Sequence, residues 1–186
     1  LEAAPTGWNG EREDPLVRWG FLDDVYADIP DARGKLIGDG RANTTAIIEW
    51  LTSRSLHPRP SSDSKANTAA IIEAGASPAA IMSRSQRRKE RNWVRGIIEA
   101  GSSSVAGAMA HLYAGGQKTD WFLPSKLELN ALYRERMIVG GFTEDTYWSS
   151  SQMNKRVAWY KSFTGEGFQK SGETSRRMRV RPVRAF

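Results

Sequence analysis

The chain carries few side chains that could perform catalysis or hold a metal ion. It has no cysteine and two histidines, His57 and His111, which excludes disulfides, thiolate metal sites and cysteine nucleophiles. Neither histidine stands at metal-ligand spacing from an acidic residue. The Gly38-Asp39-Gly40 stretch lacks the spacing and closing glutamate of a calcium loop. No nucleophile elbow, phosphate-binding loop or pair of catalytic carboxylates is recognisable. We therefore expect a protein that is not an enzyme and that uses no cofactor or metal.

Positive charge at the C-terminal end is the other chemical feature. Residues 150–186 hold nine lysines and arginines and two glutamates, which gives +7, whereas the whole chain carries +6. This end is either a face that attracts anions or a solvated surface on strands, and the sequence leaves both interpretations open. A second basic run, 84–95, falls on an expected helix, where a solvated face is the favoured interpretation. Together with the arginine-rich last strand and the rings of Trp93, Tyr160 and Phe168, it makes nucleic-acid or polyanion binding the alternative function.

Helices are expected to position the basic end. Ser125 and Glu128 have the spacing of a capping box, which starts a helix, and Gly140-Gly141 ends that helix. A shorter helix is expected around 105–113, from apolar residues at helical spacing.

A local repeat precedes these helices. Residues 41–49 are echoed by 65–73 at an offset of 24, and both copies have a helical pattern. Asn43 and Asn67 are expected to be the N-caps of the two copies. We interpret the repeat as a duplicated helical segment inside one domain that spans 1–186.

Strands are expected near both ends of the chain. Residues 16–22 predict an early strand, and 165–167 predict a hairpin turn after a strand over 157–164. One face of that strand is expected to be buried and carries Val157, Trp159, Lys161 and Phe163. The other face is expected to be solvated and carries Ala158, Tyr160, Ser162 and Thr164. In the last strand Met178 and Val180 are expected on one side, with Arg177, Arg179 and Arg181 on the other.

Residues 119–186 resemble the C-terminal domain of bacterial collagen-like adhesins, the Lcl C-terminal domain family. The resemblance rests on Gly38-Asp39-Gly40 with Asn43-Thr44, on 120–125 with Glu128-Leu129, and on Leu132-Tyr133, 140–142, 147–151, Ala158-Trp159 with Phe163, and 180–186. It implies an α+β, C-type-lectin-like fold, related to formylglycine-generating enzymes, with two main helices on small antiparallel sheets and the terminal strands paired. In such a fold much of the motif is expected to be core: Trp121, Phe122, Leu129, Tyr147, Trp148 and Trp159. Residues 52–116 match the family poorly, and we interpret them as a helical insertion.

The resemblance also implies a binding surface. Some members of the family are diversified by retroelements, which scramble adenine-rich codons in this segment and keep the rest of the frame. Lysine, glutamine, glutamate, methionine and tryptophan cannot arise in that way. Positions that remain permitted, and that are expected to contact a ligand, are Asn154, Arg156, Tyr160, Ser162, Thr164, Phe168, Ser171, Thr174, Ser175 and Arg176. Small polar and tyrosine side chains also suit a binding surface, because they adapt hydrogen bonds and lose little entropy.

The expected partner is a macromolecule, either a protein or an anionic glycan, with nucleic acid less favoured. The chain has 186 residues with 39% hydrophobic, which is enough for one globular core. No apolar run is long enough to cross a bilayer. The resemblance favours the cell surface or secretion, while a phage particle or the cytoplasm stays open. Because the chain begins at Leu1 without an initiator methionine, we expect a piece of a longer protein.

Overall fold

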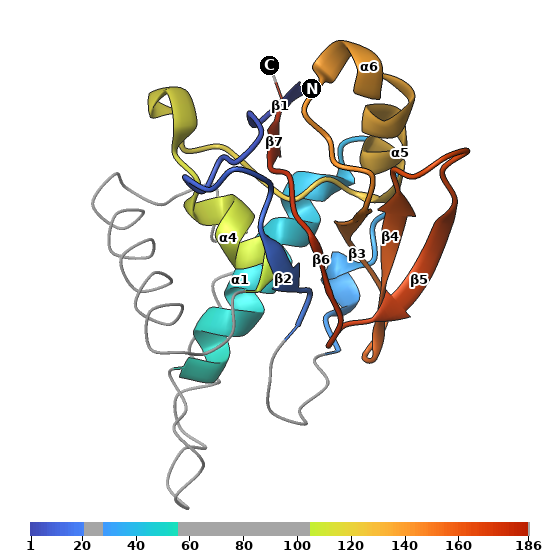
Figure 1. Ribbon diagram of the computed structural model, residues 1–186. Coiled ribbons are helices and arrows are strands. Elements are labelled where there is room, and N and C mark those ends of the chain that lie inside the picture. Colours follow the sequence, from blue (N-terminus) through green and yellow to red (C-terminus); the bar gives the residue numbers. More distant parts are fainter. Residues whose placement is uncertain (21–27, 56–104, 186) are drawn as a thin grey trace, which may run out of the picture.

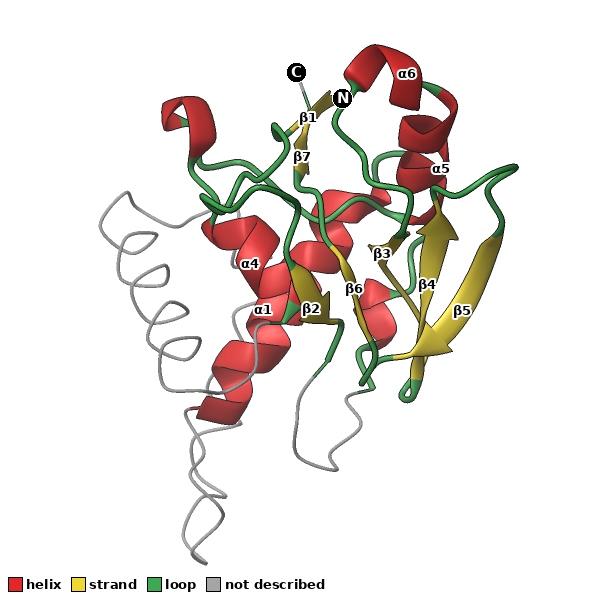
Figure 2. Cartoon of the chain, viewed as in Figure 1, coloured by secondary structure: helices red, strands yellow, loops and turns green. Residues whose placement is uncertain are grey.

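The computed structural model describes residues 1–20, 28–55 and 105–185 (Figure 1). Several predictions lie outside these residues: His57, the cap at Asn67, the basic run 84–95 and most of the predicted insertion. The described residues form a mixed α+β fold, as predicted, with helices on a pair of sheets (Figure 2).

A five-stranded sheet forms the centre of the molecule. Its strands lie in the order β2 (Leu16–Arg18), β6 (Arg177–Arg179), β3 (Thr146–Asn154), β4 (Val157–Ser162) and β5 (Gln169–Glu173). Only the β3–β6 pair is parallel. The hairpin predicted at 165–167 joins β4 to β5, where Gly165 and Gly167 adopt φ of 53° and 63°. These angles suit glycine, which lacks the Cβ that makes such conformations costly.

The two ends of the chain meet in the sheets. The small second sheet pairs β1 (Glu2–Ala3) with β7 (Val183–Arg184), and the early strand β2 pairs with β6. Figure 1 shows both chain ends beside β1 and β7. The pairing of terminal strands expected from the resemblance is therefore present.

Helices cover both faces of the central sheet. They are α1 (Asp39–Ser55), α4 (Ala106–Leu112), α5 (Lys126–Arg134) and the single turn α6 (Arg136–Val139), with 3₁₀ turns at η1 (Pro30–Ala32) and η4 (Gly115–Gln117). The main core lies between α1, α4 and one face of the sheet, and it includes Ile47, Trp148 and Tyr160. A second core lies under α5 and includes Leu129, Tyr147 and Phe163. Since both faces of β3 and β4 meet packed side chains, neither strand has a solvated face along its whole length.

The predicted capping box is confirmed. The Ser125 hydroxyl accepts from the Glu128 backbone N–H, and the Glu128 carboxylate accepts from the Ser125 N–H at 2.7 Å. Helix α5 and the turn α6 then run to Gly140, which has φ of 71°, so the predicted stop at Gly140-Gly141 is also confirmed.

Asn43 is not a helix N-cap, contrary to the prediction, because α1 begins four residues earlier at Asp39. Its buried side chain instead holds the preceding loop. The amide nitrogen donates to the Gly34 carbonyl at 2.7 Å and to the Ser150 hydroxyl at 3.1 Å, and the amide oxygen accepts from the Gly34 N–H. Asn43 therefore joins α1 to β3 and does not cap the start of the helix.

The serines of the Tyr147-to-Ser151 motif are buried and polar. Ser149, Ser150 and Ser151 are all fully buried, and each finds a partner outside the ladder. The Ser149 hydroxyl donates to the Trp159 carbonyl, and the Ser151 hydroxyl donates to the Gly34 carbonyl. Because a buried polar group without a partner is costly, the Ser151 bond fixes the loop before α1 against β3, while the Ser149 bond joins β3 to β4.

The C-terminal part of the predicted insertion belongs to the main core. Val105 and Ala106 are buried, and a Cβ at Gly107 would lie 3.0 Å from the Ile47 side chain. Helix α4 therefore packs directly on α1.

Candidate ligand-binding surface

The structure divides the ten predicted contact residues into an exposed group and a buried group. Those on the surface are Asn154, Arg156, Thr164, Phe168, Ser171, Ser175 and Arg176. The other three are buried: Tyr160 is 8% exposed, Ser162 is 0% and Thr174 is 7%. A ligand can therefore reach seven of the ten predicted positions.

The predicted solvated face of β4 is wrong. Ala158 and Tyr160 belong to the main core, and the Tyr160 ring meets Trp148 edge-on with centroids 6.1 Å apart. The Ser162 hydroxyl lies 2.8 Å from that of Thr164, its one exposed neighbour from the predicted face. Side chains of β4 do alternate between the two faces of the sheet. Because α1 and α5 cover opposite faces, however, this alternation does not divide buried side chains from exposed ones.

The motif residues predicted to be core are buried, with one exception. Trp121, Phe122, Leu129, Tyr147 and Trp148 are all at most 4% exposed, which confirms the prediction. Trp159 is only half-buried. The Lys126 ammonium lies 3.7 Å from its ring centroid, so a lysine of α5 covers the ring.

Two turns at the same end of the sheet bring four of the exposed positions together. We call this the turn surface: residues 154–156 between β3 and β4, and residues 175–177 between β5 and β6. The Thr174 backbone N–H donates to the Arg156 carbonyl at 2.9 Å, which joins the two turns. Figure 1 shows this end of the sheet pointing away from α6.

Local hydrogen bonds shape each turn. The Asn154 side-chain oxygen accepts from the N–H groups of Arg156 and Val157, at 2.9 and 3.2 Å. On the other side the Arg176 N–H donates to the Glu173 carbonyl. Asn154 therefore forms its turn, as asparagine commonly does, while the side chains of Arg156, Ser175 and Arg176 lie on the surface.

The remaining predicted positions lie along the exposed edge of the sheet. Ser171 is on β5, which pairs with β4 and has no partner strand on its other side among the described residues. Thr164 and Phe168 flank the hairpin tip at the opposite end from the turn surface. Phe168 is 47% exposed, and the Lys170 ammonium lies 4.7 Å from its ring centroid.

Three arginines near the C-terminus are paired with acids and so do not form an anion-binding face. Arg181 is 2% exposed and pairs with buried Asp14, with Nε to Oδ2 at 2.6 Å. Arg179 pairs with Glu13 and Asp145, and Arg184 pairs with Glu2 and Asp120. Arg181 therefore belongs neither to an anion-attracting face nor to a solvated surface, because its charge is matched by an acid of the N-terminal segment.

Four cations remain exposed at the turn surface: Lys155, Arg156, Arg176 and Arg177. Sequence reasoning placed Lys155 in the constant frame and did not single out Arg177 as a contact. The signal that could have found them is their place beside the two turns, since turn residues project from a hydrogen-bonded scaffold.

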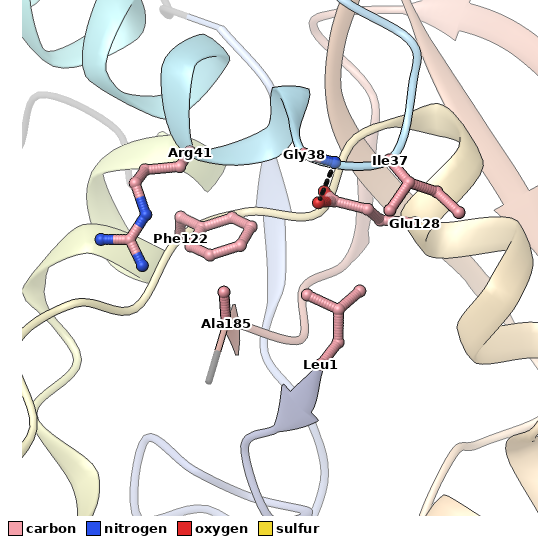
Figure 3. A pocket seen from close by; sticks show the side chains of 7 residues that line it. All are labelled: Leu1, Ile37, Gly38, Arg41, Phe122, Glu128 and Ala185. Carbon is pink, nitrogen blue, oxygen red and sulfur yellow. Dashed lines mark hydrogen bonds between the residues drawn. The ribbon is translucent and has the colours of Figure 1, made fainter.

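A hollow of about 390 Å³ lies on another part of the molecule (Figure 3). Its walls are largely apolar and include Leu1, Ile37 and Phe122. The polar groups at its edge already have partners: Glu128 accepts from the Gly38 N–H at 2.9 Å, and Arg41 pairs with Asp120 at 3.6 Å. This hollow suits a small apolar group better than a reacting substrate.

Within the described ranges, no group of three or more His, Asp or Glu side chains could hold a metal ion. Among the helices of that same part of the chain, none has the length and apolar character to cross a membrane.

No protein-family model matches the sequence, and no curated protein matches it. The family resemblance and the function it implies therefore stay predictions.

Proposed function

We propose that this protein is a non-catalytic binding domain with a C-type-lectin-like fold, and that the turn surface contacts an anionic macromolecule. The observation that carries the proposal is the bond between Thr174 and Arg156. It unites, on one rigid end of the sheet, exposed side chains from segments about twenty residues apart in the sequence.

The surroundings of the turn surface support a display role. Buried residues directly beside it, Ala158 and Met178, hold the strands on which the turns end. Side chains on such a frame can change without loss of the fold, because exposed substitutions usually alter stability little.

The charge of the turn surface determines the class of partner. Four exposed cations stand there, against Glu173 as the adjacent acid. A sulfated glycan or an acidic protein surface fits this balance, and electrostatic attraction speeds such encounters. Nucleic acid gains no support from the last strands, since Arg179, Arg181 and Arg184 are already paired with acids.

Heparin is a suitable probe of the turn surface. Replacing Arg156 and Arg176 together with alanine should weaken heparin binding at least about tenfold, the factor for losing one charge-assisted hydrogen bond. The free energy of unfolding should change by less than about 1 kcal/mol. Calorimetric titration gives the affinity, and thermal unfolding gives the stability.

The matched control removes the same charge elsewhere. Arg12 and Lys118 are exposed and lie outside the turns, so the R12A/K118A variant should keep most of the heparin affinity. Equal losses in both double variants, or no heparin binding by the unaltered protein, would contradict an anion-binding turn surface.

Diversification by a retroelement makes a separate prediction about the gene. A near-copy of the coding stretch for 150–180, differing only where the copy has adenine, should stand beside a reverse transcriptase. Sequenced variants should differ at exposed positions such as Arg156, Ser171 and Arg176. They should keep Tyr160 and Ser162, whose burial leaves no room for random side chains. Variation concentrated at Tyr160 and Ser162 would refute this part of the proposal.

A further inference from the structure

Lys161 is a buried cation with no acidic partner in the part of the chain that the structure describes. It lies near the end of β4 under α5 and is only 5% exposed. Its ammonium donates to the Asn130 side-chain oxygen at 2.9 Å and to the Gly167 carbonyl at 3.1 Å. An ammonium has three N–H donors, and the third has no acceptor among the described residues.

Two arginines add positive charge beside Lys161. Arg134 ends α5 and is exposed, while Arg136 begins α6 and is half-buried. Burial, together with the charges of Arg134 and Arg136, lowers the pKa of Lys161. We call these three residues the cation cluster.

The ring of Tyr133 lies against the cluster. The Lys161 ammonium is 4.3 Å from the ring centroid, and the Arg136 guanidinium carbon is 4.1 Å from it. A ring face attracts cations, but this attraction is weaker than a charge-assisted hydrogen bond. Both cations therefore lie against the ring of Tyr133, which does not neutralise their charge.

No ion pair neutralises the cluster. Among the described residues, none of its members forms a salt bridge, whereas Arg179, Arg181 and Arg184 all do. The nearby acids in the sequence, Glu135 and Glu166, are exposed and form no ion pair with it. Moving an unpaired charge from water into a protein costs free energy that an anion would offset.

The backbone around Lys161 is fixed in advance. The Tyr133 hydroxyl donates to the Gly165 carbonyl at 2.7 Å, which holds the hairpin tip against α5. At Gly167 a Cβ would lie 2.2 Å from the Tyr133 ring, so the tip can approach this closely only with glycine there. The acceptors of Lys161 thus sit on a rigid support, and its remaining donor keeps a constant position.

We propose that the cation cluster binds a tetrahedral oxyanion, a sulfate or phosphate group, through the third donor of Lys161 and the guanidinium groups of Arg134 and Arg136. A doubly charged oxyanion matches several neighbouring cations and accepts several hydrogen bonds at once. The cluster lies at the end of β4 away from the turn surface. The inference therefore does not depend on the proposed function.

Thermal unfolding with added sodium sulfate or sodium phosphate tests the inference, with sodium chloride at equal ionic strength as the reference. A ligand that binds the folded state raises the melting temperature in a saturable way. The unaltered protein should show this saturable rise. Lys161→Met should weaken the apparent sulfate affinity at least about tenfold, as expected when a charge-assisted hydrogen bond is lost.

Lys170→Met is the matched control, because Lys170 is exposed and also lies against an aromatic ring. It should respond to sulfate like the unaltered protein. General salting effects of sulfate act on every variant alike, so the difference between the two variants reports the site.

A second variant covers the case in which Lys161→Met does not fold. Replacing Arg134 and Arg136 with glutamine changes side chains nearer the surface and should weaken sulfate binding by a similar factor. If the unaltered protein, the Lys161 variant and the double variant respond equally to sulfate, the inference is overturned.

The source of the oxyanion is distinguished by titration with a sulfated disaccharide and its unsulfated counterpart. Tighter binding of the sulfated sugar than of inorganic sulfate identifies a group carried on a glycan. Equal or weaker binding identifies a free anion. Equal binding of both sugars, with no response to inorganic sulfate or phosphate, overturns the site.

Discussion

Two buried cations of the central sheet region have opposite surroundings. Arg181, just beyond β6, meets the Asp14 carboxylate and donates to the carbonyls of Ala4 and Gly141. Lys161, on β4, meets a neutral amide oxygen, a neutral carbonyl and an aromatic ring. Both side chains are at most 5% exposed.

We call Arg181 a structural charge, because its acidic partner lies within the fold. We call Lys161 a recognition charge, because the proposed oxyanion would neutralise it. The Asp14–Arg181 pair joins residues 167 positions apart and fastens the N-terminal segment to the last strands. Tyr147 adds a hydrogen bond to the same carboxylate at 3.1 Å. The charge of Arg181 is thus paired inside the fold, and each of its three side-chain nitrogens donates a hydrogen bond there. Lys161 has no such partner among the described residues, so a counter-ion for it would come from outside them.

Breaking the Asp14–Arg181 pair should have the largest effect on stability. Asp14→Asn keeps the shape of the side chain and removes its charge, which leaves the Arg181 guanidinium buried without a counter-ion. We expect a loss of about 3–5 kcal/mol in the free energy of unfolding, measured by chemical denaturation.

Glu13→Gln is the control for that substitution. Glu13 pairs with Arg179 at 2.7 Å, but its side chain is 49% exposed, so its loss should cost less than about 1 kcal/mol. A cost for Asp14→Asn as small as that for Glu13→Gln would remove the distinction between a structural and a recognition charge.

The sequence predicted the elements better than the faces. Ser125 and Glu128 made the start of α5 predictable, since a capping box depends only on residues three apart. The hairpin at 165–167 was predictable for the same local reason. Tyr160 and Ser162 were not, because their burial depends on α1 and α5 lying on opposite faces of the sheet. That arrangement is a property of the tertiary structure, and a period of two is compatible with burial on one face or on both.

Charge partners were the least predictable feature. The arginines at 179, 181 and 184 form one basic run in the sequence, and their partners are Glu2, Glu13, Asp14, Asp120 and Asp145. All five acids lie 34 or more residues away, so a count of charge over a C-terminal window cannot detect the pairing. Four positions of the turn surface, Asn154, Arg156, Ser175 and Arg176, were predicted from the resemblance. That the two turns lie together became visible only with the bond between Thr174 and Arg156.

The pH dependence of stability should be the smallest of the predicted effects. It tests whether the charge of Lys161 is less favourable in the folded protein than in water. Burial first, and then the charges of Arg134 and Arg136, lowers the pKa of Lys161 in the folded state, against 10.5 for the unperturbed group. Between the lowered pKa and 10.5 the unfolded chain binds more protons than the folded chain. The free energy of unfolding therefore rises with pH in that window.

Lys161→Met removes this contribution, so the stability of the unaltered protein relative to that variant should increase as the pH rises through the window. Denaturation curves of both proteins at several alkaline pH values measure the difference, and the ionisation of tyrosines common to both cancels. Saturating sulfate should flatten the difference, because a bound anion stabilises the charged ammonium and raises its pKa again. Parallel pH curves for the two proteins without sulfate would mean that Lys161 ionises as in water, and the contrast with Arg181 would then lose its electrostatic basis.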